Sequence, residues 1–387
     1  MNAYIITLVS ILYLVKAFCL SQGITNIFIN SITYGLSIYV SFLFIYHSTK
    51  GTISIGNRIF NYVFYIFIIY SLILCIAYDF THGFFNRTIV SILFNYVLGF
   101  TSIILLYRYA VIKPKCLKFL YLFSSIITIS FFTFCLINSP IHSVFIKFSF
   151  SNDLISYQTL SGFTFRIYVC NIFMYLLLSR YNQSCKYCLL SFVIISLLCI
   201  QFSVFAGSKK EPFLFLLNFI LVLIFTKNYR TIILSSIVFF TPILALLFKY
   251  DFNENLLLFN HLESSIFNRL KFITDNATLL LDNSLPFGIP NLDETLGLDY
   301  LHSSLLSVLR VNGIFGLTLF IIMLFLTLFR IRKNHVFLFI FILTFSLSII
   351  ATPYNWFVLW FCFGACNAYP INNEKFFILQ KYSLSYS

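Results

Sequence analysis

Charged side chains are scarce in this chain, and acidic ones are the scarcest: 12 Asp and Glu and 25 Lys and Arg are spread over 387 residues. In soluble domains about a quarter of the residues are charged. With 60% hydrophobic residues and a mean hydropathy of +0.94, the sequence has more apolar surface than one soluble core could bury. These features exclude an ordinary soluble domain and indicate an integral membrane protein.

Several recognisable sequence features are also missing. The chain has no internal repeat and no low-complexity tract, and it has no Gly-rich loop of the kind that binds nucleotide phosphates. Its predicted cytoplasmic loops are too short for a nucleotide-binding domain, so neither ATP nor a nucleotide-sugar is expected as a direct substrate. No nucleic-acid module is visible, and we interpret the net charge of +13 as a topology signal.

Apolar segments of about 20 residues, enough to cross a hydrocarbon core about 30 Å thick, recur along the whole chain. We therefore expect an all-α, polytopic membrane protein with about 12 transmembrane helices. Its 51 phenylalanines are expected mostly to face lipid. The predicted spans are residues 3–20, 24–46, 59–78, 88–107, 119–137, 163–178, 187–205, 213–225, 231–248, 305–329, 336–350 and 356–369.

One long polar stretch interrupts this pattern and divides the chain into three parts. Residues 1–248 form a transmembrane bundle of nine predicted spans, residues 249–304 a large loop, and residues 305–387 spans 10 to 12 with a tail. The N-terminal segment lacks a small-residue cleavage site, so we expect it to be an uncleaved span.

The distribution of Lys and Arg predicts the orientation, because basic residues resist translocation and stay on the cytoplasmic side of the membrane. Most basic residues fall in alternate loops and the C-terminal tail, where Glu374 is the only acid. Both termini are therefore predicted to be cytoplasmic, and the loop at 249–304 to lie on the outer side of the membrane; it would be a periplasmic loop if the membrane is a bacterial inner membrane. The basic residues on the predicted inner side are Lys50, Arg58, Arg108, Lys113, Lys115, Lys118, Arg180, Lys186, Lys227, Arg230, Arg330, Arg332, Lys333, Lys375 and Lys381.

The ten cysteines lie in predicted spans or on the cytoplasmic side, so no disulfide framework is implied. Cys185 and Cys188 form a C-x-x-C pair, but no second pair and no nearby His completes a zinc site. The sequence favours a structural role for this pair, and no metal or other cofactor is expected.

Apolar residues at helical spacing predict an amphipathic helix within the large loop, lying on the membrane surface. Polar residues such as Glu263 and Asn268 fall between them. The apolar positions are Phe259, Leu262, Ile266, Leu270 and Ile273.

Five cations are predicted on the outer side, against the general trend of charge. Lys209 and Lys210 stand between two apolar spans, Arg269 and Lys271 lie on the amphipathic helix, and Arg310 lies just inside the tenth span. Together they could bracket a diphosphate, although snorkelling to lipid headgroups and a solvated helix face are the alternatives.

A histidine at the entry to the tenth span is the candidate proton acceptor. His302 follows Asp299 by three residues, so the two share a face if this segment is helical. An imidazole there can act as a base on a sugar hydroxyl. Alternatively, His302 has no catalytic role and simply lies at the boundary between membrane and water. Glu294 in the loop is a further candidate base.

Five motifs follow one another along about residues 200–330. They are Ser208-Lys209-Lys210, Asn268-Arg269, Pro286-Phe287-Gly288, Leu301-His302-Ser303-Ser304-Leu305 and Gly313-Ile314-Phe315-Gly316-Leu317. In this order they resemble the superfamily of Wzy-type O-antigen polymerases and O-antigen ligases. The rest of the chain resembles the superfamily only in span count. Members often carry Arg where Lys209 stands and Asn where Ser303 stands.

The resemblance implies a GT-C-like fold and a metal-independent, inverting glycosyl transfer at the outer face of a bacterial inner membrane. The donor would be a glycan on undecaprenyl diphosphate and the acceptor another lipid-linked repeat unit. Lys209, Lys210 and Arg269 would hold the diphosphate, and His302, Glu294 or Asp299 would take the acceptor proton. A chain-length regulator is a further candidate partner.

Two other functions remain open at this stage. An O-antigen ligase, which joins polymer to lipid A-core, has nearly the same motifs as the polymerase. A lipid-linked oligosaccharide flippase also has about twelve spans, but we would expect two similar halves and charges facing a central cavity. The sequence shows neither pattern. Its bias toward Phe, Ile and Tyr indicates an AT-rich coding sequence. Such a composition is typical of laterally acquired O-antigen gene clusters and favours the polymerase over the ligase.

Overall fold

The structure, a computed structural model, describes part of the chain. The described residues are 31, 35, 38–39, 42–43, 45–46, 58–82, 114–138, 157–180, 185–205, 211–226, 274, 287–288, 304–334, 337–342, 345 and 357–368. Within these residues every regular element is helical, as expected for an all-α protein. The chain divides into two compact units, one containing residues 105–260 and the other residues 261–387, each with part of the N-terminal region.

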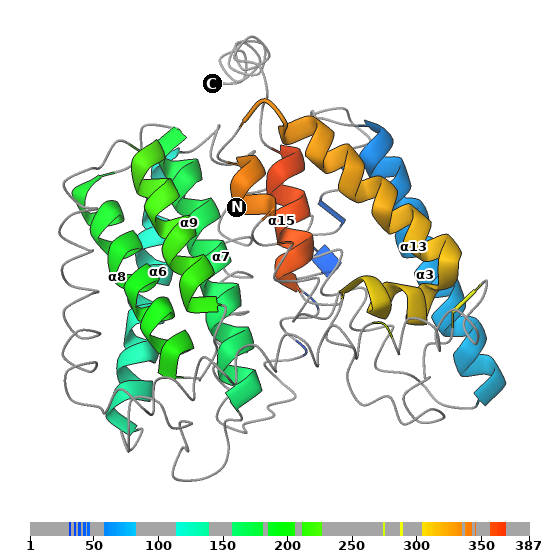
Figure 1. Ribbon diagram of the computed structural model, residues 1–387, viewed down its shortest axis with the longest axis horizontal. Coiled ribbons are helices and arrows are strands. Elements are labelled where there is room, and N and C mark those ends of the chain that lie inside the picture. Colours follow the sequence, from blue (N-terminus) through cyan, green and yellow to red (C-terminus); the bar gives the residue numbers. More distant parts are fainter. Residues whose placement is uncertain are drawn as a thin grey trace. The chain divides into compact units, whose positions relative to one another are not determined.

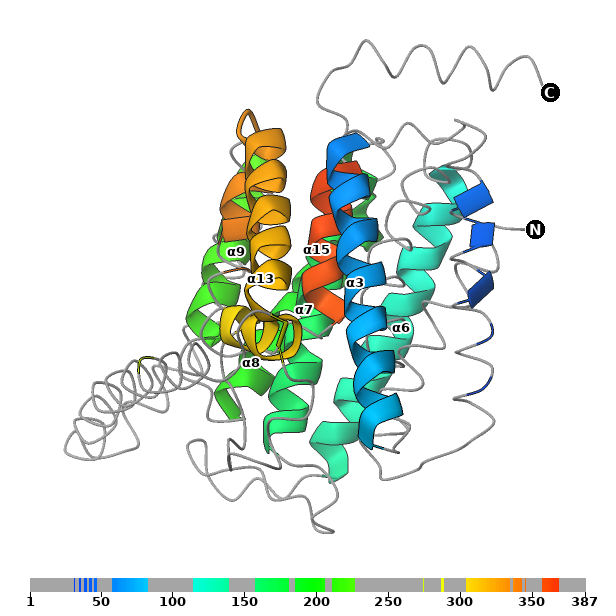
Figure 2. The ribbon, with the colours of Figure 1, turned by 90° about the vertical axis from the view of Figure 1, so that its right-hand side faces the viewer.

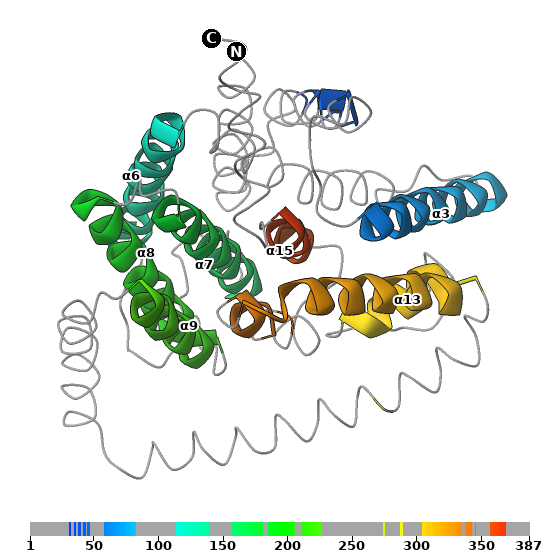
Figure 3. The same cartoon turned by 90° about the horizontal axis from the view of Figure 1, so that it is seen from above.

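The first unit contains helices α6 (Pro114–Asn138), α7 (Tyr157–Arg180), α8 (Lys186–Phe205) and α9 (Glu211–Phe225). Helix α8 contacts the other three, and α7 also contacts α6 and α9. Each of α7 and α8 therefore contacts the other three helices, and Figure 3 shows the four helices side by side.

The second unit contains helices α3 (Arg58–His82), α13 (Ser304–Ile331) and α15 (Phe357–Ala368). Helix α13 packs along α3 and also contacts α15 (Figure 2). Rings of α3 also meet rings of α15, so the three helices share one core.

The described helices support the assignment to the membrane. Three segments are long and apolar enough to cross a bilayer: Ile59–Ala77, Lys186–Ser203 and Leu305–Ile331. Shorter apolar stretches lie at Leu117–Thr133, Ile167–Leu176 and Leu214–Ile224. The spans predicted at 3–20, 88–107 and 231–248, most of the one at 24–46, and the amphipathic helix lie outside the described residues, so the count of twelve stays a prediction.

The described helices match the predicted spans, and all of them except α15 run beyond the predicted bounds. Helix α6 begins at Pro114, five residues before the predicted start, and α7 begins at Tyr157, six residues before it. Proline suits the first position of a helix because its missing N–H would be unpaired there in any case. The sequence located the apolar part of each span, while the helical hydrogen bonds continue into its polar flanks.

Aromatic side chains fill the core of the second unit. The indole of Trp360 lies 5.6 Å from the ring of Phe67 and 5.7 Å from that of Phe64, and Phe320 and Phe363 are 5.8 Å apart. All five side chains are buried. Among the phenylalanines whose side chains the structure describes, more are buried than exposed, so the expectation that phenylalanines mostly face lipid does not hold for these residues. Their flat rings can pack closely between helices.

A buried polar cluster ties three helices of the first unit together. The hydroxyl of Tyr121 on α6 donates a 2.7 Å hydrogen bond to Oδ1 of Asn171 on α7. The Asn171 amide donates to Oγ of Ser196 at 3.2 Å and to the carbonyl of Phe192 at 3.3 Å, both on α8. Such bonds between membrane helices specify one packing arrangement, because an unpaired polar group in an apolar environment is costly.

This cluster predicts a measurable coupling between two side chains. Tyr121→Phe and Asn171→Ala should each lower the free energy of unfolding by about 1 kcal/mol, and the double variant should lose less than their sum. Thermal unfolding in detergent measures these values. Thr133→Ala is the matched control because Thr133 is exposed and bonds only within α6. Strictly additive losses would show that the 2.7 Å bond contributes nothing to stability.

Candidate functional site

Helix α13 is broken at one residue. Gly313 has φ 63° and ψ −168°, which lie outside the helical region, while the residues on either side are helical. Figure 1 shows the result: the short first part of α13, drawn in yellow, runs across the direction of the long orange part. Only glycine adopts this conformation without strain, because it has no Cβ.

The break interrupts the ladder of backbone hydrogen bonds inside an apolar helix. Neighbouring groups must then satisfy the freed backbone atoms, because Asn312 is fully buried and an unpaired buried backbone group is costly. The hydroxyl of Tyr70 on α3 does this for one of them by donating a 3.0 Å hydrogen bond to the backbone carbonyl of Asn312. The Tyr70 ring also packs edge-on against Phe315, with ring centroids 4.8 Å apart. Helix α3 therefore holds both sides of the break.

The side chain of Asn312 provides a second link to α3. Its amide donates a hydrogen bond to Oγ of Ser71, and both side chains are fully buried. The Ser71 hydroxyl in turn donates to the carbonyl of Phe67 at 2.8 Å. Residue 316 must be small for this arrangement, since a Cβ on Gly316 would lie 3.2 Å from Cγ of Asn312 and closer still to its Cβ.

A segment from the large loop reaches the same point. Gly288, in the Pro-Phe-Gly motif, also has a positive φ of 79°. A Cβ added there would lie 2.7 Å from the backbone nitrogen of Asn312 and closer still to that of Gly313. The backbone of residue 288 can therefore approach the break only because it carries no side chain. Two motifs that are far apart in the sequence meet here.

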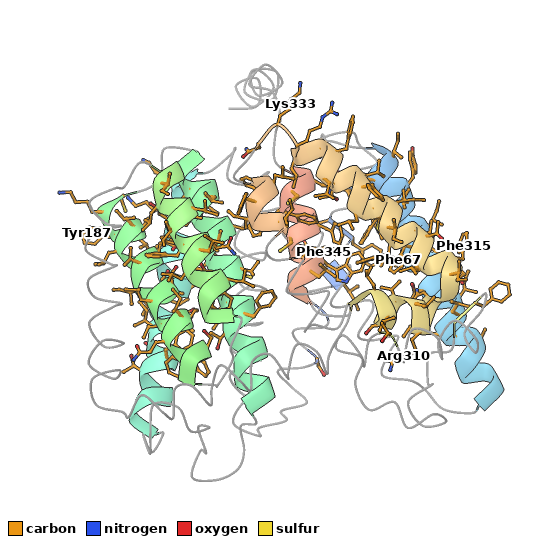
Figure 4. All side chains as sticks on the ribbon, viewed as in Figure 1. Phe67, Tyr187, Arg310, Phe315, Lys333 and Phe345 are labelled. Carbon is orange, nitrogen blue, oxygen red and sulfur yellow. The ribbon has the colours of Figure 1, made fainter. Side chains whose placement is uncertain are left out.

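Arg310 lies three residues before the break. Its side chain is partly buried, and Figure 4 shows it on the first part of α13, directed away from the long second part. Among the predicted site residues, Arg310 is the one that falls in the described part of the chain. Lys209, Lys210, Arg269, Lys271, Glu294, Asp299 and His302 lie outside the described residues.

The length of the second part of α13 indicates the depth of the break in the membrane. Residues 314–331 rise about 27 Å at 1.5 Å per residue, close to the thickness of the hydrocarbon core. Arg332 and Lys333 follow the far end, both exposed, and the guanidinium of Arg332 lies 3.8 Å from the centre of the Phe329 ring. If this part crosses the bilayer, Gly313 and Arg310 lie at the opposite boundary between hydrocarbon and water.

The motif at 313–317 marks this region in the sequence, but the break in the helix was not predicted. The dipeptide Asn312-Gly313 is a turn signal, and its place inside an apolar run could have predicted the break. Tyr70 and Ser71 gave no such signal, because their role depends on the packing of α3 against α13. In the described part of the chain, no three His, Cys, Asp or Glu side chains are placed to hold a metal ion.

Comparisons with protein-family models, curated proteins and solved structures find no significant match to this chain.

Replacing a glycine at the break by alanine should lower the melting temperature more than the same replacement at an open position. Gly313→Ala should lower the melting temperature in detergent through backbone strain of about 1–3 kcal/mol, and Gly288→Ala should do so by displacing the loop from the break. Gly35→Ala is the matched control, since a Cβ at Gly35 meets nothing within 4 Å. Equal melting temperatures for all three variants would contradict this arrangement of the break.

Proposed function

We propose that this protein is an O-antigen polymerase. It transfers a growing lipid-linked glycan from undecaprenyl diphosphate to another lipid-linked repeat unit at the periplasmic face of a bacterial inner membrane. The transfer is inverting and uses no metal. The full architecture in this proposal is a GT-C-like bundle of about twelve spans with both termini in the cytoplasm.

The observation that carries the proposal is the broken span beside a cation. A membrane helix that is interrupted near the bilayer surface presents N–H groups at the start of its second part, where the helix dipole favours negative charge. Arg310 adds a permanent positive charge three residues away. This combination suits a diphosphate whose polyprenyl tail remains in the membrane.

The topology supports an outer position for this site. Arg330, Arg332 and Lys333 cluster at the far end of α13, and the positive-inside rule places such a cluster in the cytoplasm. The end with Gly313 and Arg310 would then face the periplasm. The contact of Gly288 with the break also fits, because Gly288 belongs to the predicted periplasmic loop.

In the proposed mechanism, cations stabilise the departing diphosphate while a base activates the acceptor. Arg310 binds the diphosphate together with Lys209, Lys210, Arg269 and Lys271 from the outer face. His302 takes the proton from the acceptor hydroxyl, or a loop carboxylate, Glu294 or Asp299, does so. Inversion follows from a single attack opposite the leaving diphosphate.

A gel of lipopolysaccharide from a strain that lacks the gene tests the reaction. A polymerase predicts lipid A-core carrying a single repeat unit, with the full ladder restored by the wild-type gene. Bare core would instead indicate the ligase or the flippase, and an unchanged ladder would remove the protein from this pathway.

Arg310→Gln should abolish the restored ladder, because it removes the charge and keeps much of the side-chain shape. Arg332→Gln, at the other end of the same helix, is the matched control and should restore the ladder fully. His302→Ala and Arg269→Ala should behave like Arg310→Gln, and immunoblots of the membrane fraction check that every variant is inserted. A normal ladder from Arg310→Gln would overturn the assignment of this residue.

A further inference from the structure

Two cysteines meet at the start of helix α8, away from the break in α13. The Sγ atoms of Cys185 and Cys188 are 3.2 Å apart, within hydrogen-bonding distance for sulfur. Cys185 directly precedes the helix, and its carbonyl accepts the first helical hydrogen bond, from the N–H of Leu189 at 3.0 Å. The two thiols are therefore held together by the first turn of α8.

The two sulfur atoms differ in their access to solvent. Cys185 is partly exposed and Cys188 is fully buried, while Lys186 and Tyr187 between them are exposed. Figure 4 shows the Tyr187 side chain projecting away from α8. A reagent from the aqueous phase therefore reaches Cys185 first, and the buried sulfur of Cys188 is already in contact with it.

The surroundings of Cys185 stabilise its thiolate. Partial burial raises the pKa of the Cys185 thiol, but other groups outweigh this effect, and the pKa lies below its ordinary value. These groups are the backbone N–H and the thiol of Cys188, the backbone N–H of Tyr187, and the positive charge of Lys118 on α6. The thiolate is the reactive form of cysteine, so Cys185 is the expected nucleophile of the pair.

We propose that Cys185 and Cys188 form a thiol–disulfide exchange site that reacts with small-molecule disulfides. The thiolate of Cys185 attacks one sulfur of the disulfide, whose S–S bond breaks and releases one thiolate. Cys188 then gives up its proton to water, and its sulfur attacks that of Cys185, releasing the second thiolate. The protein dithiol loses two electrons and the small disulfide gains two.

The small loop makes this bond reversible and unsuited to a structural role. A disulfide stabilises a protein mainly by closing a loop, and the effect is least for short loops such as the one from residue 185 to 188. Weakly stabilised, accessible disulfides are the ones that cellular thiols reduce. A metal site is less well supported, since the described residues hold no group of three or more suitable ligands.

The test uses the full-length protein purified in detergent and incubated with glutathione disulfide. Mass spectrometry of the peptide that contains both cysteines should show the loss of two hydrogen atoms, and reduced glutathione should reverse it. Cys188→Ser should stop at a glutathione adduct on Cys185, because the second attack is lost. Cys185→Ser should give neither product, and Cys199→Ala, which alters a buried thiol on the same helix, should react like the wild type.

A second measurement on the unaltered protein guards against variants that fail to fold. Iodoacetamide should alkylate Cys185 at least about tenfold faster than the buried Cys199. Three results would each overturn the proposal. They are an unchanged peptide mass at every concentration of glutathione disulfide, equal alkylation rates for Cys185 and Cys199, and zinc bound by Cys185 and Cys188 in the purified protein.

Discussion

Buried backbone groups need hydrogen-bond partners, and the break in α13 leaves some of its buried groups without the partners that a continuous helix would supply. A continuous helix of this composition would satisfy its own backbone and need no neighbours. The conformation of Gly313 instead makes α13 depend on α3: Tyr70 binds the carbonyl of Asn312, and Ser71 accepts a hydrogen bond from its side chain. Gly288 then reaches the same point with its backbone. The break is costly on its own and is maintained by contacts from two other segments, which is typical of functional sites.

The remaining core of the second unit consists largely of buried aromatic side chains. Trp360 contacts Phe64, Phe67 and Phe320, so α15 holds α3 and α13 together at the level of their buried rings. In the first unit, the buried side-chain amide of Asn171 links α7 to α6 and α8 instead. Asn171 bonds to Tyr121 and Ser196 where purely apolar helices could slide past one another. Both sets of contacts fix the arrangement of the helices within a unit.

Much of the fold could be predicted from hydropathy alone, because the length of an apolar run nearly determines a membrane helix. The run at 305–329 predicted α13 to within two residues at its C-terminal end. The packing of the helices could not be predicted in the same way. Whether Phe320 faces lipid or Trp360 depends on which helices meet, and an even apolar composition does not encode this. For the same reason the sequence identified Arg310 as a cation on the predicted outer side but did not reveal the break beside it.

Binding of undecaprenyl diphosphate to the purified protein, measured by native mass spectrometry, tests the central claim most directly. The lipid presents the diphosphate without any sugar, so the result does not depend on the repeat unit. The account predicts that the wild type and Arg332→Gln bind it equally, and that Arg310→Gln binds at least about tenfold more weakly, as expected for one lost charge-assisted hydrogen bond. Equal binding by Arg310→Gln and the wild type would contradict the claim that the broken end of α13 recognises the diphosphate.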